Sequence, residues 1–188
     1  MIADRLTTTG PSPIASVFKV CVIGASGVGK TSLVRRLVER TFAERIPVTP
    51  GVAIARMRLT VIDPGGVIRP LTLVLWDLQG DGSAIVRLTH LRGAAGYALV
   101  TDGTDRERLA GVQALRAQAN AVTGGASSLV LLNKSDLATG RDDADDADAL
   151  AMLRPYVRTS ARDGAGVEEA FRTLAASIVA ARLAAATA

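Results

Sequence analysis

The chain has 188 residues, of which 48% are hydrophobic and 21% charged, and its formal net charge is +4. This length suits one domain with a full hydrophobic core, and a single cysteine excludes an internal disulfide framework. The basic residues are dispersed and aromatic residues make up only 3% of the chain, so we expect no nucleic acid as a partner. The sequence has no apolar signal-peptide core and no uncharged apolar run near the roughly 18 residues of a membrane helix, so we expect a cytoplasmic protein.

The first part of the chain predicts a leader, a strand and a helix. Residues 1–16 are polar and contain several turn formers, so we expect a disordered leader. Residues 17–23 form a short β-branched apolar run, which predicts a buried strand. From Lys30 onward the apolar period changes to that of a helix with one inward face. The residues predicted on that face are Leu33, Val34, Leu37 and Val38.

The next segment predicts a β-hairpin. Two apolar runs, 52–62 and 67–76, flank the sequence Asp-Pro-Gly-Gly at 63–66, which is typical of a turn. Proline has no N–H to donate to a sheet ladder, so we expect the second strand to pair regularly only after Pro70.

The remaining sequence alternates strands and helices. Residues 97–101 and 129–132 are short apolar runs typical of buried parallel strands. Asp105 is a suitable cap for a helix between them, and a last helix is predicted after Gly166. This alternation with one hairpin predicts a mostly parallel, three-layer α/β sheet, whose ligands bind beyond the carboxyl ends of its strands.

The residues between the first strand and the first helix carry a phosphate-binding pattern. Residues 24–31 read G-A-S-G-V-G-K-T and match G-x-x-x-x-G-K-[ST] in the strand–turn–helix context that this pattern requires. Glycines let successive backbone N–H groups point at a phosphate, and the helix dipole adds to their field. Lys30 would bridge the β- and γ-phosphates and Thr31 would coordinate Mg²⁺, although the pattern alone does not separate ATP from GTP. The candidate phosphate-binding residues are Gly24, Ala25, Ser26, Gly27, Val28, Gly29, Lys30, Thr31 and Ser32.

A second candidate site lies at the end of the hairpin's second strand. Asp77 ends an apolar run, where its carboxylate is placed to hold Mg²⁺ through water, opposite Thr31. Gly80 has no Cβ, so its N–H can approach a γ-phosphate closely. The spacing D-x-x-G after a phosphate-binding loop therefore indicates a metal and γ-phosphate site.

The sequence Asn-Lys-Ser-Asp at 133–136 directly follows the predicted strand at 129–132. A carboxylate accepts two hydrogen bonds from guanine, from N1–H and from the exocyclic amine, and adenine does not offer these donors in that arrangement. A site built around such polar groups discriminates by factors of roughly 10⁴ or more. Asp136 is therefore the candidate for guanine recognition, with Asn133 in the same motif and the stem of Lys134 over the base.

These motifs, in this order, resemble those of the Ras/Rab-like small GTPases, here of prokaryotic type, in the P-loop GTPase superfamily. The resemblance extends from about Phe18 to Arg182. It implies a three-layer P-loop G domain at 17–183, with a mostly parallel six-stranded sheet and one antiparallel edge hairpin strand, and a short tail at 184–188. It also implies a nucleotide-dependent switch with GTP or GDP as ligand and Mg²⁺ as cofactor.

The resemblance assigns roles to further residues. Phe42 would pack on the guanine, and Thr49 would bind Mg²⁺ and sense the γ-phosphate. The sequence Thr-Ser-Ala-Arg that begins at 159 resembles the fifth guanine motif, which ends here with Arg162. In that motif Ser160 would orient the loop and the backbone N–H of Ala161 would contact the guanine O6.

The sequence departs from the family at one catalytic position. The family usually has a glutamine after D-x-x-G that orients the attacking water, but this chain has Asp81. Aspartate is shorter, donates no hydrogen bond when ionised and brings negative charge towards the phosphate, so we expect slow GTP hydrolysis unless a partner assists. Gln79 is an alternative for orienting the water, and Arg45 and Arg87 lie in the two presumed switches. The catalytic candidates are Lys30, Thr49, Gly80, Asp81 and Gln79.

The resemblance also indicates the kinds of partner. An effector and a GTPase-activating protein are expected to contact the two presumed switches, 42–52 and 79–93. The chain ends without a cysteine, so we expect no direct lipid anchor. Two alternatives stay open. One is a GTP-binding scaffold with negligible hydrolysis, motivated by Asp81, and the other is an ATP-dependent kinase, which conflicts with the motif at 133–136.

Overall fold

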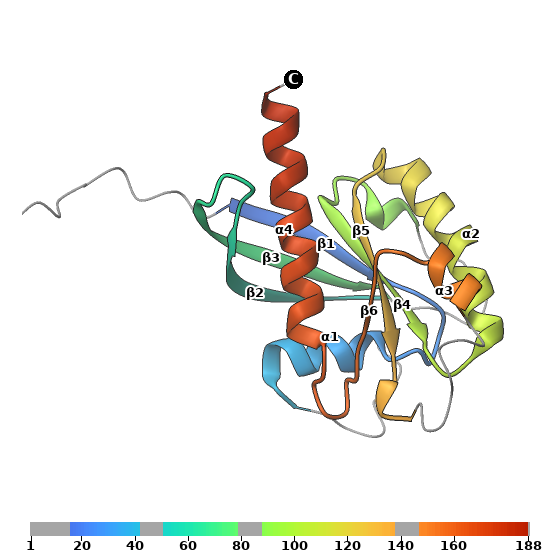
Figure 1. The fold of residues 1–188 in the computed structure, drawn as a ribbon. Coiled ribbons are helices and arrows are strands. Elements are labelled where there is room, and N and C mark those ends of the chain that lie inside the picture. Colours follow the sequence, from blue (N-terminus) through green and yellow to red (C-terminus); the bar gives the residue numbers. More distant parts are fainter. Residues whose placement is uncertain (1–15, 42–50, 79–87, 138–146, 188) are drawn as a thin grey trace, which may run out of the picture.

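The computed structural model describes residues 16–41, 51–78, 88–137 and 147–187 (Figure 1). Of the expected leader at 1–16, only Ser16 falls within this part of the chain, and it begins the first strand. The elements in chain order are β1 (Ser16–Ile23), α1 (Lys30–Glu39), β2 (Val52–Ile62), β3 (Ile68–Leu78), the 3-10 turn η1 (Leu88–Leu91), β4 (Gly96–Asp102), α2 (Arg106–Thr123), β5 (Ser127–Asn133), the 3-10 turn η2 (Ser135–Leu137), α3 (Ala147–Met152), β6 (Tyr156–Arg158) and α4 (Val167–Ala186).

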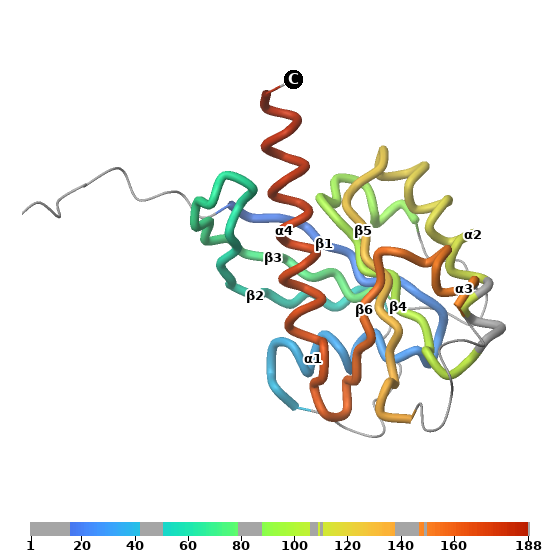
Figure 2. The backbone as a smooth tube through the Cα atoms, viewed as in Figure 1, coloured from blue at the N-terminus to red at the C-terminus, as the bar shows by residue number. Residues whose placement is uncertain are grey.

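The strands form one six-stranded sheet in the order β2-β3-β1-β4-β5-β6. Only β2, at the edge, runs antiparallel to its neighbour β3. Side chains of α1 and α4 pack on one face of the sheet, and those of α2, α3 and η1 pack on the other, which gives three layers (Figure 1 and Figure 2). The predicted fold class, a three-layer and mostly parallel α/β sheet with one antiparallel edge strand, is confirmed.

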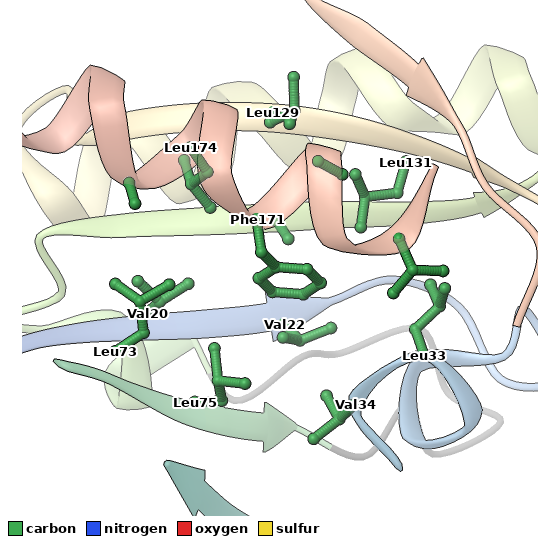
Figure 3. Close-up of a cluster of buried hydrophobic side chains, with 14 of the residues drawn as sticks. Val20, Val22, Leu33, Val34, Leu73, Leu75, Leu129, Leu131, Phe171 and Leu174 are labelled. Atoms are coloured by element: carbon green, nitrogen blue, oxygen red, sulfur yellow. The ribbon is translucent and has the colours of Figure 1, made fainter. Parts of the chain in front are cut away.

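One hydrophobic core lies between the sheet and the helices α1 and α4. Phe171 of α4 is 1% exposed and directs its ring at β1, where it meets Val20 and Val22 (Figure 3). Leu33 and Val34 of α1 belong to the same cluster. Burial of each large apolar side chain contributes roughly 1.5–3 kcal/mol, and together these contacts hold both helices on the sheet.

The predicted inward face of α1 is right for its first turns and wrong for Val38. Leu33 and Val34 are buried and Leu37 packs against the core, but Val38 is 40% exposed. Val38 lies about 100° from Leu37 around the helix axis, and its exposure shows that at this end of α1 the sheet covers only the side that carries Leu37.

β2 and β3 form the predicted hairpin, and Asp63 closes its turn. The carboxylate accepts hydrogen bonds from the N–H groups of Gly65 and Val67, both at 2.9 Å, and pairs with Arg69 at 2.8 Å. The hydrogen bond from Val67, followed by that from Arg69, lowers the pKa of Asp63. Because the folded-state pKa lies below the unfolded value, this stabilisation is present at neutral pH and is lost as the pH falls through the folded-state value.

The expectation that regular pairing begins only after Pro70 is wrong. The β2–β3 ladder begins at Ile62 opposite Ile68 and places Pro70 opposite Thr60. Within the described chain, β1 pairs with β3 only from Leu71 onward. Among the described residues, Pro70 therefore pairs with β2 alone, and an edge position of this kind tolerates a residue without an N–H.

Sequence patterns did not locate β6, because a strand of three residues is too short for a periodic pattern to develop. The six-residue helix α3 begins at the end of the acidic stretch 142–148, whose acids are typical of a helix N-terminus. The last helix begins after Gly166 as predicted and continues to Ala186, into the segment expected as a tail. In the part of the chain that the structure describes, no helix combines the length and apolarity needed to cross a membrane.

The core position of Phe171 leads to a test. Phe171→Ala removes a large buried side chain and leaves a cavity, so we expect the free energy of unfolding to fall by about 3–5 kcal/mol in chemical denaturation. Val38→Ala on exposed α1 surface is the matched control, with an expected change below about 1 kcal/mol. Equal losses in the two variants would contradict the packing of this ring.

Candidate functional site

The loops after the parallel strands lie at one edge of the sheet. Because β1, β3, β4 and β5 run in the same direction, their carboxyl ends meet there. The loop at 24–29 leads from β1 into α1, and η2 follows β5 (Figure 2). The candidate residues at 24–32, 77 and 133–136 are therefore brought together, although they are far apart in the sequence.

Two glycines shape the loop between β1 and α1. Gly24 has φ +149° and Gly29 has φ +95°, in the region that side chains other than glycine rarely adopt. A Cβ on Gly24 would overlap with the carbonyl oxygen of Val100 in β4, and one on Gly29 would overlap with the side-chain amide of Asn133. The glycines thus allow the loop to approach the ends of β4 and β5 closely.

Lys30 lies inside this loop. Its Nζ donates hydrogen bonds to the carbonyl oxygens of Gly24 at 2.9 Å and Ala25 at 2.8 Å, and the residue is only 7% exposed. Burial lowers the pKa of Lys30, and the charge of Asp77 opposes that shift. Neutral carbonyls stabilise the ammonium group only partly, so an anion bound in the loop would meet a cation already in position.

Asp77 and Thr31 form a second polar pair beside the loop. The hydroxyl of Thr31 donates to Oδ2 of Asp77 at 2.5 Å, while Oδ1 of Asp77 is buried and has no hydrogen-bond partner among the described residues. Burial is the main cause that raises the pKa of Asp77, against the hydrogen bond from Thr31 and the charge of Lys30. A buried acceptor without a partner is costly, and a cation at Oδ1 would supply one.

These oxygens fit Mg²⁺, which binds carboxylate and hydroxyl oxygen and usually keeps water and ligand phosphates in its shell. Within the described ranges, no group of three or more His, Cys, Asp or Glu side chains could hold a metal. Among the described residues, Thr31 and Asp77 would provide part of the coordination shell. That donor set suits a metal bound together with a phosphate ligand.

The side-chain amide of Asn133 ties the loops together. Its Nδ2 donates to the carbonyl oxygen of Val28 at 2.8 Å, and its Oδ1 accepts from Ala161 N–H at 3.2 Å and from the Thr159 hydroxyl at 3.4 Å. Asn133 is 1% exposed, so these bonds are shielded from water. The sequence places Asn133 in the base motif, and the structure adds that it braces the phosphate-binding loop.

The neighbouring residues of the base motif are also held by side chains. Asp136 accepts a hydrogen bond from the Ser160 hydroxyl at 2.8 Å and lies 3.9 Å from the Arg162 guanidinium. Lys134 donates to Oδ2 of Asp102 at 2.7 Å. The structure thus brings 133–136 and 159–162 together, as the resemblance to the family implies.

Asp102 is a functional candidate that sequence reasoning missed. It ends β4 at the same edge of the sheet, and its Oδ1 accepts from the N–H and hydroxyl of Thr104. Burial raises the pKa of Asp102, but hydrogen bonds from Lys134 and Thr104 outweigh it and the net pKa is lowered. The sequence does carry a signal for Asp102, because it follows the predicted strand at 97–101. Asp77 was identified by the same kind of position, an acid at the carboxyl end of a strand.

Several predicted site residues cannot be placed in this arrangement. They lie outside the described part of the chain, together with the two arginines of the presumed switches. These residues are Phe42, Arg45, Thr49, Gln79, Gly80, Asp81 and Arg87.

The sheet order and the glycine-rich loop between β1 and α1 are those of a P-loop G domain. The chain belongs to the Ras family, whose sequence pattern it matches over residues 19–180. It is 33% identical over 164 residues to the Ras-related protein SEC4 of Saccharomyces cerevisiae, an alignment that covers 85% of this chain and 74% of SEC4. The resemblance to Ras/Rab-like proteins is confirmed, and the chain is a small GTP-binding switch protein with GTP and GDP as ligands.

The contact between Gly29 and Asn133 gives a test of the loop. Gly29→Ala should lower the free energy of unfolding by at least about 1–3 kcal/mol, because the strained backbone and the overlap with the Asn133 amide act together. Gly27→Ala is the control, since Gly27 has φ +76° but open space around its Cβ position. Thermal or chemical unfolding of the nucleotide-free chain should place Gly27→Ala between wild type and Gly29→Ala. The reverse order would be incompatible with the close approach of the two loops.

Proposed function

We propose that this protein is a nucleotide-dependent switch that binds GTP or GDP with Mg²⁺ and hydrolyses GTP slowly unless a partner assists. The observation that carries the proposal is the buried Lys30 ammonium group enclosed by the loop carbonyls, beside the Asp77–Thr31 pair. A buried cation and a buried, partly unpartnered carboxylate in one site are costly in the absence of ligand. A phosphate with a divalent cation compensates both.

The phosphates occupy the loop between β1 and α1. The backbone N–H groups of residues 24–32 surround the β-phosphate, and Lys30 exchanges its carbonyl partners for phosphate oxygens. Thr31 and Asp77 would hold Mg²⁺, with Thr49 as a further contributor by family resemblance. When bound, the metal neutralises charge on the β- and γ-phosphates.

The guanine base lies against the loops after β5 and β6. Asp136 accepts from N1–H and the exocyclic amine, and its bond from Ser160 orients the carboxylate for this purpose. The stem of Lys134 covers one side of the base, and by resemblance Phe42 packs on the guanine. The N–H of Ala161 contacts O6, with Arg162 as its neighbour in the motif, and Asn133 holds the loop that carries both.

Hydrolysis proceeds by in-line attack of water on the γ-phosphorus. Lys30, the loop N–H groups and the N–H of Gly80 stabilise the negative charge that develops on the phosphate oxygens. Thr49 contacts the γ-phosphate and releases it after cleavage. Asp81 orients water poorly because an ionised carboxylate repels the phosphate, and Gln79, two residues earlier in the sequence, is the alternative that offers an amide.

The proposal also includes the extent of the domain and the surfaces that partners contact. The G domain spans 17–183. An effector and a GTPase-activating protein contact residues 42–52 and 79–93, which sense the γ-phosphate through Thr49 and Gly80. Nucleic acid is not a partner in this proposal, because none of the site elements requires one.

A second candidate function is a GTP-binding scaffold with negligible hydrolysis. Asp81 in place of the family's usual glutamine favours it. Multiple-turnover release of phosphate from GTP and Mg²⁺, with and without candidate partners, separates the two. Turnover in either condition supports the switch, whereas retention of intact GTP in both supports the scaffold.

Lys30 provides a test of nucleotide binding. Lys30→Arg keeps the positive charge, but a planar guanidinium does not fit the space between the carbonyls of Gly24 and Ala25. We therefore expect the affinity for GDP and GTP to fall by about tenfold or more, measured by titration in the presence of Mg²⁺. Lys19→Arg, outside the site, is the matched control with unchanged affinity. Near-normal GTP affinity in Lys30→Arg would count against the proposed phosphate site.

Asp81 provides a test of hydrolysis. We expect Asp81→Gln to accelerate single-turnover hydrolysis of bound GTP by about tenfold or more, which corresponds to about 1.4 kcal/mol of barrier. Asp81→Ala is the control, because it removes the negative charge without supplying an amide, and its acceleration should be smaller. If glutamine gave no gain over alanine, the assignment of water positioning to this residue would be wrong.

A further inference from the structure

The side chain of Arg36 joins α1 to the loop between β6 and α4. Its Nε donates a hydrogen bond to the carbonyl oxygen of Ala161 at 2.8 Å, and its Nη2 donates to the carbonyl oxygen of Arg162. A bond from Nη1 to the carbonyl oxygen of Arg40 at 3.2 Å fixes the guanidinium against the end of α1. The start of α4 lies beside α1, so this loop is close to the helix that begins at the phosphate-binding residues (Figure 1).

The stem of Arg36 also contacts the loop. Gly164 has φ +92°, and its Cβ position lies 3.5 Å from Cδ of Arg36, which is ordinary van der Waals distance. The residue is half-buried, unlike its exposed neighbour Arg35. Arg36 is therefore packed along the loop over its length and not only at its charged end.

The loop is held from two opposite sides. On the side of β5, Asn133 accepts from the N–H of Ala161, and Asp136 accepts from the hydroxyl of Ser160. On the side of α1, Arg36 donates to the carbonyl of the same Ala161. The two bonds to Ala161 fix the two successive peptide groups that flank its Cα.

We propose that Arg36 is a positioning residue for the nucleotide base: by bridging the carbonyl oxygens of Ala161 and Arg162, it holds the Ala161 N–H where that group meets the guanine O6. This inference rests on the proposed function, which assigns the Ala161 N–H to O6. Because Arg36 is on the helix whose first residues are Lys30 and Thr31, it also sets the distance between the base and the phosphates.

The chemistry of the side chain explains why arginine serves here. A guanidinium offers parallel N–H groups in one plane, so it can bond two successive carbonyls at once. A lysine ammonium is a point charge on a flexible stem and holds one orientation less firmly. The role therefore depends on the fork of donors and not on the charge alone.

The test compares two nucleotides on the full chain with Mg²⁺. One is GDP, and the other is the diphosphate of 2-aminopurine riboside, which lacks the 6-oxygen and the proton on N1. Arg36→Met should weaken GDP binding by about tenfold and change the affinity for the analogue by less than about twofold, because the analogue has no acceptor for the Ala161 N–H. The readout is the affinity for GDP divided by the affinity for the analogue. A merely structural role would leave this ratio unchanged.

Arg172→Met is the matched control. Arg172 also donates to a distant backbone carbonyl, that of Thr60, but it joins α4 to β2 outside the site, so the affinity ratio should stay at the wild-type value. If Arg36→Met does not fold, Arg36→Lys takes its place and should also lower the ratio, because a single ammonium does not bridge both carbonyls.

Two results overturn the inference. An equal loss for both nucleotides assigns Arg36 to general stability, and an unchanged GDP affinity in a folded Arg36 variant removes the role altogether. A separate measurement on the wild-type chain compares GDP with ADP. Failure of the proposed function would appear there as no preference for GDP, before any substitution is made.

Discussion

The candidate site depends on one buried side-chain amide, that of Asn133 at the end of β5. It bonds the carbonyl of Val28 in the phosphate-binding loop, and the N–H of Ala161 and the hydroxyl of Thr159 in the loop after β6. A buried polar group that loses its partner costs about 1–3 kcal/mol, so the three segments are stable only in their joint arrangement. The phosphate end and the base end of the site are therefore coupled through the fold before any ligand arrives.

The same edge of the sheet carries two buried charges that the fold leaves incompletely compensated. Burial lowers the pKa of Lys30 and raises the pKa of Asp77, so both side chains are pushed towards their neutral forms. The strand register places Asp77 directly beside Val22, near the end of β1, so the acid lies next to the loop that holds the lysine. The hydrophobic clusters on both faces of the sheet supply the stability that maintains this unfavourable pair.

Sequence patterns predicted the features that depend on local chemistry, and the structure added those that depend on distant contacts. The strand–loop–helix at 17–40 and the turn at Asp63 follow from neighbouring residues, so they could be predicted. The bond from Arg36 to Ala161 joins positions 125 residues apart, and no local pattern reveals it. The pairing at Pro70 differs from the sequence prediction for a related reason, since the cost of a missing N–H depends on which strand lies alongside.

The chain has 22 basic residues, of which only three are lysines, and the site explains why both types are needed. Lys30 places a slim ammonium between two carbonyls inside a closed loop, and Lys134 bonds Asp102 while leaving its stem beside the base motif. Arg36 instead bonds two carbonyl oxygens on the outside of a loop, those of Ala161 and Arg162, which suits the planar arrangement of donors in a guanidinium group. The third lysine, Lys19, stacks 4.0 Å from the ring centre of Trp76 and donates to a carbonyl, a contact in which either cation would serve. Geometry at each carbonyl, more than charge, thus decides which cation each position of the site requires.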